Sequence, residues 1–358
     1  MVNKENSCNV LIVSDVHLGA LKSELDLFQK FLTAVNNGEF GNQLQALIIL
    51  GDFFDICTDT PESLFNDNQI IQILEKLKKI QSERDLVFVL GNHEIPVTGN
   101  YDEKFNDRKN KFFERVKIGV FDDNFNDNSF CQYIILKKYN NEDALLLYNS
   151  IEDMFDGYIN KIKINGLELE NNYECLMTHG YQFDNEIFRF LAGMIWKTLI
   201  KSDDIALKET FDYLWNIIIK GDQRVKESKL EDMLEQLPEL KNLEQQTIKD
   251  NFSEYNTYNF AFVKLIMRIL EKWEEVQKYE YYLEGISDFL KDKSHKLSNI
   301  NHLIYGHSHK CKISKENINN NDIKIVNDGA WQHVNPSYVQ ISFKGHLEII
   351  NKIPTIDV

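Results

Sequence analysis

The chain has 358 residues with 43% hydrophobic content, which suffices for one large α/β domain with an elaboration or for two domains. Its formal net charge of −16 argues against a nucleic-acid partner, because such partners are usually bound by a basic face that we do not find in the sequence. No apolar segment approaches the roughly twenty residues of a transmembrane helix, so we expect a soluble protein with no transmembrane segment.

The cysteines and the N-terminus favour a cytoplasmic location. The five cysteines have neither paired spacing nor a C-x-x-C motif, which is typical of reduced thiols rather than disulfides. Residues 1–7 are polar. The apolar run behind them has only about five residues before Asp15, which is too short for the core of a signal peptide.

Strand and helix patterns alternate in the first part of the chain. Apolar runs predict strands at 9–14, 47–50 and 86–90. Apolar residues near helical period predict helices at 23–35, with Ser23 as the N-cap, and at 70–80. Such strand-helix-strand units predict parallel pairing, with the carboxyl ends of the strands at one edge of the sheet.

Further strands follow later in the chain. Residues 134–136 and 144–148 are typical of an antiparallel pair, separated by the polar stretch 140–143. Residues 338–343 and 347–350 predict a hairpin across the turn Lys344-Gly345. Single strands are expected at 175–177, 303–305 and 323–326.

Between 181 and 300 the composition changes. This stretch contains one proline and three glycines, while leucine, isoleucine, glutamate and lysine recur at helical spacing, so we predict an α-helical insertion. Its apolar run at 187–200 is either the core of the insertion or a groove for an apolar part of a substrate.

Five of the apolar runs end in residues that can bind a metal ion or move a proton. In chain order these junctions are Asp15-Val16-His17, Gly51-Asp52-Phe53-Phe54-Asp55, Gly91-Asn92-His93-Glu94, Thr178-His179-Gly180 and Gly306-His307-Ser308-His309. Side chains two residues apart in an extended segment point the same way, so Asp15 and His17 can bind one ion. Oxygen and imidazole ligands without cysteine suit Mn, Fe, Zn or Co.

This order of junctions resembles the calcineurin-like metallophosphoesterase superfamily, whose blocks read D-x-H, G-D-x-x-D, G-N-H-D/E, H-G and G-H-x-H. The resemblance covers the ends of five strands between residues 10 and 309. It implies an α/β fold, a metallophosphoesterase β-sandwich flanked by helices, with the large α-helical insertion added to it. We place the catalytic domain at 1–184 and 299–358 and the insertion at 185–298. Because both ends of the insertion adjoin ligand-bearing blocks, we expect both to return to the rim of the site, where the insertion could act as a lid; a helical bulge remote from the substrate is the alternative.

The resemblance also implies a dinuclear metal site with two divalent ions, Mn first and Fe, Zn or Co as alternatives. The implied ligands of one metal are Asp15, His17 and His309, and those of the other are Asn92, His179 and His307. Asp52 would bridge the two, one carboxylate oxygen to each ion. His93 would stabilise the transition state or protonate the leaving oxygen, and Asp55 would hold its imidazole in place.

Other polar residues have weaker assignments. We interpret Glu94 as a capping or loop carboxylate. The stretch Asn327-Asp328-Gly329-Ala330-Trp331 resembles the N-x-G-S/A-W segment that often follows the last histidine pair in this superfamily, and it either shapes the pocket wall or forms a plain turn. Four histidines fit no block and are expected on the surface or in packing: His295, His302, His333 and His346.

Several functions remain open within the superfamily. Ile56 stands where the protein serine/threonine phosphatases carry an Arg, which disfavours that branch. The segment 179–184 and the helical insertion are similar to the bacterial UDP-2,3-diacylglucosamine hydrolases, although His93 stands where those enzymes usually have Arg and their insertion is shorter. We therefore expect hydrolysis of a phosphodiester or pyrophosphate bond in a small substrate that could contain a lipid or a nucleotide. The alternatives are a phosphomonoesterase or protein phosphatase and, in another class, a non-catalytic scaffold that retains the fold.

Overall fold

The computed structural model divides the chain into two compact units, residues 1–182 with 290–358 and residues 183–289. The structure describes residues 8–20, 23–55, 64–94, 112–114, 116, 129–156, 160–183, 280–292, 297, 299–309, 311–318, 320–331 and 336–350. Most of the expected insertion, residues 184–279 with the apolar run at 187–200, lies outside the described residues. Of the insertion, only the helix α12 (Glu280–Asp292) and residue 297 are described, so the bounds 185–298 and the lid remain predictions.

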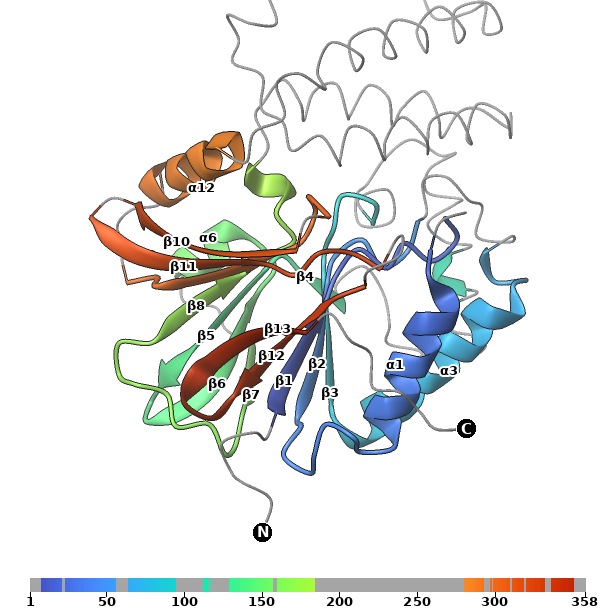
Figure 1. Ribbon diagram of the computed structural model, residues 1–358. Coiled ribbons are helices and arrows are strands. Elements are labelled where there is room, and N and C mark those ends of the chain that lie inside the picture. Colours follow the sequence, from blue (N-terminus) through green and yellow to red (C-terminus); the bar gives the residue numbers. More distant parts are fainter. Residues whose placement is uncertain are drawn as a thin grey trace, which may run out of the picture. The chain divides into compact units, whose positions relative to one another are not determined.

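The larger unit contains two β-sheets that face each other, with α1 (Leu25–Asn36) and α3 (Asn68–Glu83) on the outer face of the first (Figure 1). The first sheet has the order β13-β12-β1-β2-β3-β4. Its strands are β1 (Cys8–Val13), β2 (Ala46–Leu50), β3 (Asp85–Val89), β4 (Phe130–Cys131), β12 (Tyr338–Ser342) and β13 (His346–Ile350).

The second sheet has the order β10-β11-β9-β8-β5-β6-β7. Its strands are β5 (Tyr133–Tyr139), β6 (Glu142–Tyr148), β7 (Asn160–Lys163), β8 (Glu174–Met177), β9 (His302–Tyr305), β10 (Lys312–Ile318) and β11 (Asn321–Asn327). The short helices α6 (Ile151–Asp156), η3 (Tyr181–Phe183) and η5 (Phe343–Gly345) complete the described elements. This architecture confirms the expected α/β sandwich flanked by helices.

The central strand β1 is buried on both faces. Leu11 and Val13 belong to the apolar core beneath α1 and α3, whereas Val10 and Ile12 belong to the core between the two sheets. A strand covered on both sides reads as a continuous apolar run, because neither face meets water. The run Val10–Val13 was therefore recognisable in the sequence.

Parallel pairing brings strand ends to a common edge. β1, β2 and β3 pair in parallel in the first sheet, and β8, β9 and β11 do so in the second. The predicted antiparallel pair β5–β6 and the hairpin β12–β13 are also confirmed. The candidate residues of the five junctions follow β1, β2, β3, β8 and β9 directly.

Among the strands in the described residues, β4, β7 and β10 were missed. β7 and β10 are edge strands with largely exposed, polar side chains, so they lack the apolar pattern on which the prediction depended. On β7, Lys161 and Lys163 both pair with Glu142 of the neighbouring strand. Charged side chains of this kind are common on sheet edges, where they discourage pairing with another chain.

The start of α1 differs from the expectation. Glu24, not Ser23, is the N-cap, and it makes no side-chain capping hydrogen bond. The Ser23 hydroxyl instead donates to the carbonyl oxygen of His17, while the Glu24 N–H donates to the carbonyl oxygen of Trp331 at 2.9 Å. The chain entering α1 is thus tied to the candidate site, and a long-range contact replaces the local cap.

The end of the insertion also differs from the expectation. Since β8 and β9 are parallel neighbours, β9 begins at the edge of the sheet opposite the one where β8 ends. The Asn301 N–H accordingly donates to the carbonyl oxygen of Glu174, at the start of β8. The expectation that both ends of the insertion return to the rim of the site is wrong for the C-terminal end. Only the N-terminal end, just after His179 and Gly180, leaves from that edge.

Candidate metal centre

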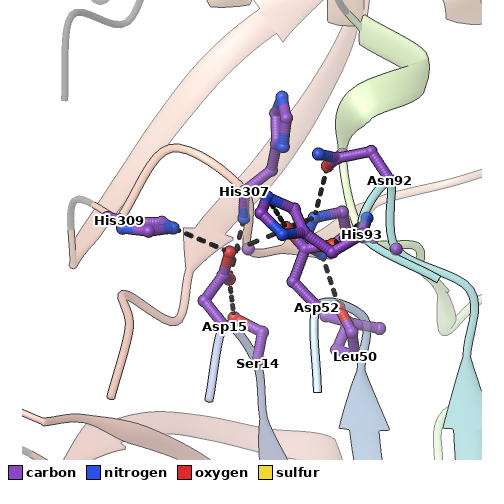
Figure 2. A network of polar contacts seen from close by, with 12 residues as sticks. Ser14, Asp15, Leu50, Asp52, Asn92, His93, His307 and His309 are labelled. Atoms are coloured by element: carbon purple, nitrogen blue, oxygen red, sulfur yellow. Dashed lines mark hydrogen bonds and ion pairs between the residues drawn. The ribbon is translucent and has the colours of Figure 1, made fainter. Parts of the chain in front are cut away.

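The five junctions converge in one buried cluster (Figure 2). A first group, here called the Asp15 group, consists of Asp15, His17 and His309, whose potential ligand atoms lie within 4.8 Å of one another. Asp15 Oδ1 is 3.1 Å from His309 Nε2 and 3.8 Å from His17 Nε2. One oxygen and two imidazole nitrogens thus surround a common space.

A second group, the His179 group, consists of Asp52, His179 and His307, again with ligand atoms within 4.8 Å. Asp52 Oδ2 lies 3.1 Å from His179 Nε2, and Asn92 Oδ1 lies 3.2 Å from the same nitrogen. His179 Nδ1 is 2.8 Å from the carbonyl oxygen of Leu50, which makes Nδ1 the protonated nitrogen of the neutral ring and leaves Nε2 as the ligand atom.

His93 stands between the groups. Its Nδ1 is 3.0 Å from Asp55 Oδ1, and its Nε2 is 3.9 Å from Asp52 Oδ2. The His93 and His17 rings meet edge to face, with centroids 4.5 Å apart. The structure therefore brings together every residue that the sequence nominated for the site, with Asp55 behind His93.

The backbone at these junctions is strained. Five candidate ligands have positive φ, although none is glycine: Asp15 at 52°, His17 at 50°, Asp52 at 50°, His307 at 66° and His309 at 55°. Such conformations cost about 1–3 kcal/mol each and persist where the surroundings impose them. Here backbone hydrogen bonds join the segments Asp15–His17 and Gly51–Asp55. The Asp15 N–H donates to the carbonyl oxygen of Gly51 at 3.0 Å, and the His17 N–H donates to that of Asp52 at 2.9 Å. Strain concentrated on polar, buried residues indicates a functional site.

The glycines of the junctions allow close approach. A Cβ on Gly51, whose φ is +88°, would lie 2.5 Å from His179 Cγ. A Cβ on Gly91 would overlap the backbone nitrogen of Asp52. Only glycine lets these segments lie close enough for their neighbours' side chains to share one space.

Burial and mutual attraction set the charges in the cluster. Burial alone would lower the pKa of His179 and His93, but nearby carboxylates, Asp52 foremost, outweigh it and raise these pKa values to about 10 and about 9. Burial alone would raise the pKa of Asp52, but His179 and His93 hold it below its usual range. Burial lowers the pKa of His309 to about 4, so this imidazole is neutral at pH 7.

The donor set fits two divalent cations. Within the described part of the chain, the buried atoms Asp15 Oδ1 and Asp52 Oδ2 accept no hydrogen bond, although imidazole nitrogens surround both. Asp52 Oδ1 already accepts the backbone N–H of His93 at 2.8 Å. Oδ2 alone therefore faces both His17 of the Asp15 group and His179 of the His179 group. This differs from the expectation of one Asp52 oxygen for each ion.

Glu94 is confirmed as a capping carboxylate. It accepts three backbone N–H groups, from Phe54 at 2.8 Å, Gly91 at 2.9 Å and Asp52 at 3.0 Å. Its burial, reinforced by Asp52, raises its pKa to about 7. Glu94 thus connects the segment Gly51–Asp55 to the segment Gly91–Glu94.

The four histidines outside the five junctions have no part in the cluster as far as they are described. His302 is a packing residue, stacked on Tyr173 with ring centroids 4.5 Å apart, and His346 is exposed. His295 and His333 lie outside the described residues.

The segment Asn327–Trp331 supports the site from behind. Asn327 Nδ2 donates to Gly306 O at 3.3 Å, and the Trp331 N–H donates to Asp15 O at 3.0 Å. The Trp331 ring packs on Phe28 of α1, with centroids 4.9 Å apart. Sequence reasoning named Asp328 only as part of this segment and missed Ser14, which contacts Asp328 beneath Asp15. A serine at the buried end of an apolar strand was the available signal.

The fold and the site together define a metal-dependent phosphoesterase. The model of the calcineurin-like phosphoesterase family matches residues 8–311, so the chain belongs to this family. No curated protein matches the sequence significantly. A solved structure titled "GAP50 the anchor in the inner membrane complex of Plasmodium" is similar, with 10% identity and a TM-score of 0.33 over 98% of this chain and 88% of that chain. None of the helices in the described ranges is both long and apolar enough to cross a membrane.

Proposed function

We propose that this protein hydrolyses phosphodiester or pyrophosphate bonds in a small substrate with the help of two divalent metal ions. The observation that carries the proposal is the pair of ligand groups that meet at Asp52. The ligands of one ion would be Asp15, His17 and His309, those of the other Asn92, His179 and His307, and Asp52 Oδ2 would lie between them. When bound, the ions supply positive charge to the phosphoryl oxygens and lower the pKa of a water at the site.

His93 is the proposed catalytic residue. Its Nδ1–H is oriented by Asp55 at 3.0 Å, so Nε2 faces the space around Asp52 Oδ2. The raised pKa of His93, about 9 in the metal-free site, keeps Nε2 protonated at neutral pH. From there Nε2 donates to the leaving oxygen or to a charged oxygen of the transition state. Asp55 is a positioning residue, since it acts on the substrate through His93; its Oδ2 also lies 3.9 Å from Nδ1 of His17.

The finer features of the proposal rest on the sequence. Mn²⁺ is the metal we propose, and the similarity of 179–184 to the diacylglucosamine hydrolases supports a pyrophosphate or diester with an apolar or nucleotide part. The buried free thiols Cys8, Cys131 and Cys175 support a reducing compartment such as the cytoplasm, because disulfides form in oxidising ones.

Activity of the Mn²⁺-loaded protein tests the proposal. We expect hydrolysis of an aryl phosphodiester or a nucleotide pyrophosphate to exceed that of an aryl phosphomonoester. Asp52→Asn is the matched control, because a neutral amide binds metal ions more weakly than a carboxylate. Preference for the monoester would favour the phosphomonoesterase alternative. Two bound Mn²⁺ ions with no hydrolysis of any of the three substrates would favour the scaffold alternative.

A further inference from the structure

A buried serine and a buried aspartate lie behind the Asp15 group. The Ser14 hydroxyl is in hydrogen-bonding contact with Asp15 Oδ2 and lies 2.7 Å from Asp328 Oδ1. All three side chains are at most 1% exposed. Ser14 follows β1 and Asp328 follows β11, so the contact joins the ends of strands from the two sheets. Asp328 lies beyond residue 311, where the match to the family ends.

Hydrogen counting assigns the donors in this network. Asp15 Oδ2 accepts the His307 N–H at 2.9 Å and also contacts the Ser14 hydroxyl. A hydroxyl has one hydrogen, so Ser14 can donate to only one of its two carboxyl neighbours. The other contact needs a hydrogen from the carboxyl group itself. Asp328 is the group that supplies it, because two imidazole nitrogens surround Asp15 Oδ1 and a backbone N–H donates to Asp15 Oδ2, whereas Asp328 Oδ2 accepts no hydrogen bond within the described residues.

The electrostatics agree with this assignment. Burial, reinforced by the charge of Asp15, raises the pKa of Asp328 well above its usual range. The chain of donation therefore runs from Asp328 O–H to Ser14 Oγ and from Ser14 O–H to Asp15 Oδ2. The neutral Asp328 is thus the first donor of this hydrogen-bond series, and the ionised Asp15 faces the histidines.

This chain determines how Asp15 presents its charge. Two donors, Ser14 and the His307 N–H, hold Oδ2, and Oδ1 is thereby turned toward His309 Nε2 at 3.1 Å. The space around Oδ2 is filled, because a Cβ on Gly306 would overlap both Ser14 Oγ and Asp15 Oδ2. Asp15 therefore has little freedom to rotate while Ser14 is in place.

We propose that Asp328, acting through Ser14, is a positioning residue that orients Asp15 for metal binding and sets the affinity of the Asp15 group for its ion. The proposal rests on the dinuclear site proposed above. Removing a hydrogen-bond partner of a metal ligand typically lowers metal affinity by about 10- to 100-fold, which is the effect expected here.

Calorimetric titration of the metal-free full chain with Mn²⁺, paired with thermal unfolding of the same samples, tests this role. The variants are Asp328→Leu, Asp328→Asn, Ser14→Ala and the double variant Ser14→Ala with Asp328→Leu. Ser337→Ala is the matched control, because its hydroxyl donates to the backbone carbonyl of Asp328 and its side chain is equally buried. Loss of that contact should lower the melting temperature and leave both Mn²⁺ affinities unchanged.

We expect Asp328→Leu and Ser14→Ala each to weaken one of the two Mn²⁺ sites by about 10- to 100-fold. Asp328→Asn should retain wild-type affinity, because its amide N–H can donate to Ser14 Oγ. The double variant should bind no more weakly than Ser14→Ala, since Asp328 acts only through the hydroxyl. Ser14→Ala carries the same test if Asp328→Leu does not fold.

Three results would overturn the role of Asp328: unchanged Mn²⁺ affinity in folded Ser14→Ala and Asp328→Leu, additive losses in the double variant, or a loss in Asp328→Asn as large as in Asp328→Leu. Each of these leaves the dinuclear site standing, because wild type would still bind two ions. Wild type that binds no Mn²⁺ would overturn both the site and this role.

Discussion

At the scale of single residues, the proposed metal ligands and the proposed catalytic residue His93 differ in their contacts. His93 has its Nδ1 committed to Asp55 and its Nε2 directed into the cluster. His179, in contrast, contacts Asp52 Oδ2 and Asn92 Oδ1 with Nε2. The two histidines therefore differ in what their substitution should change.

We predict that His93→Asn binds both metal ions and keeps the fold, but lowers kcat by about two to four orders of magnitude, because a proton donor or transition-state hydrogen bond is lost. Steady-state kinetics with metal content measured on the same sample check this. Asp52→Asn should instead lose metal. Near wild-type kcat of His93→Asn on a substrate with a poor leaving group would contradict the assigned role.

Comparison of leaving groups defines the role of His93 further. Loss of a general acid slows chiefly a substrate with a poor leaving group, because a good one such as nitrophenolate needs little protonation. Loss of a donor to the charged transition state slows both substrates alike. The ratio of the two effects in His93→Asn therefore distinguishes the two chemistries.

Metal binding should release protons. The pKa of His179 in the metal-free site is raised to about 10, so its imidazole carries a proton at pH 8 that a metal ion must displace. The apparent Mn²⁺ affinity should therefore rise with pH up to about the pKa of His179. Calorimetry at pH 8 in two buffers of different ionisation enthalpy should give a release of about one proton or more.

The control for this release is His93→Asn, which removes the other histidine with a raised pKa. It should still release a proton when Mn²⁺ binds, since His179 is intact. Heats of binding that are the same in both buffers would show that His179 is already neutral before the metal binds, contrary to the charge balance that Asp52 imposes.

At the scale of elements, each ligand depends on how closely two strand ends approach. Gly91 lies against the backbone of Asp52, and Glu94 accepts N–H groups from both of these residues. The segment Gly91–Glu94 is therefore held against Asp52 by packing and by backbone N–H groups, not through the atoms proposed to bind metal. A change at Gly91 should disturb the site through packing alone, because its φ is not in the left-handed region.

We predict that Gly91→Ala lowers Mn²⁺ affinity by at least about tenfold, because the added Cβ must displace the backbone of Asp52. Gly38→Ala is the matched control: Gly38 has φ +74° but open space around it, so this variant should lose about 1 kcal/mol of stability and no metal affinity. Titration and thermal unfolding of both variants check the pair. Equal Mn²⁺ affinity of Gly91→Ala and wild type would show that metal binding does not require the close contact between Gly91 and the backbone of Asp52.

At the scale of the whole molecule, the catalytic unit is interrupted by a second unit of residues 183–289. The ends of this second unit are close together, since the Phe183 and Phe289 rings meet with centroids 5.4 Å apart. A shortened chain that keeps Phe183 and α12 should thus be connectable by a flexible linker. The lid hypothesis now depends on the N-terminal end of the insertion, which leaves from the edge of the sheet that carries His179, and on α12, which the contact of Phe289 with Phe183 places beside that end.

We predict that replacing residues 185–279 by a short Gly/Ser linker leaves two Mn²⁺ ions bound and an aryl phosphodiester hydrolysed at near wild-type kcat. For the best larger substrate from the activity screen, KM should rise steeply, because a lid contributes binding energy only to groups that it covers. Equal losses on both substrates, in a variant shown to be folded and metal-loaded, would contradict the lid.

The sequence by itself nominated the residues of the candidate site and predicted most of the described strands. Both signals are local: an apolar run marks a strand buried on two faces, and Asp15, His17 and the other junction residues stand directly after such runs. Parallel pairing then requires these ends to meet at one edge. The polar edge strands β7 and β10 carry no such local signal and were not predictable in the same way.

Only the tertiary structure decided how these residues are oriented. Asp52 presents Oδ2 because the His93 N–H occupies Oδ1, and Asp15 presents Oδ1 because Ser14 and the His307 N–H hold Oδ2. The contact of Ser14 with Asp328 spans 314 positions, and the entry of β9 at the far edge follows from its parallel pairing with β8. Each of these depends on contacts between segments that are distant along the chain, which a local pattern of residues does not encode.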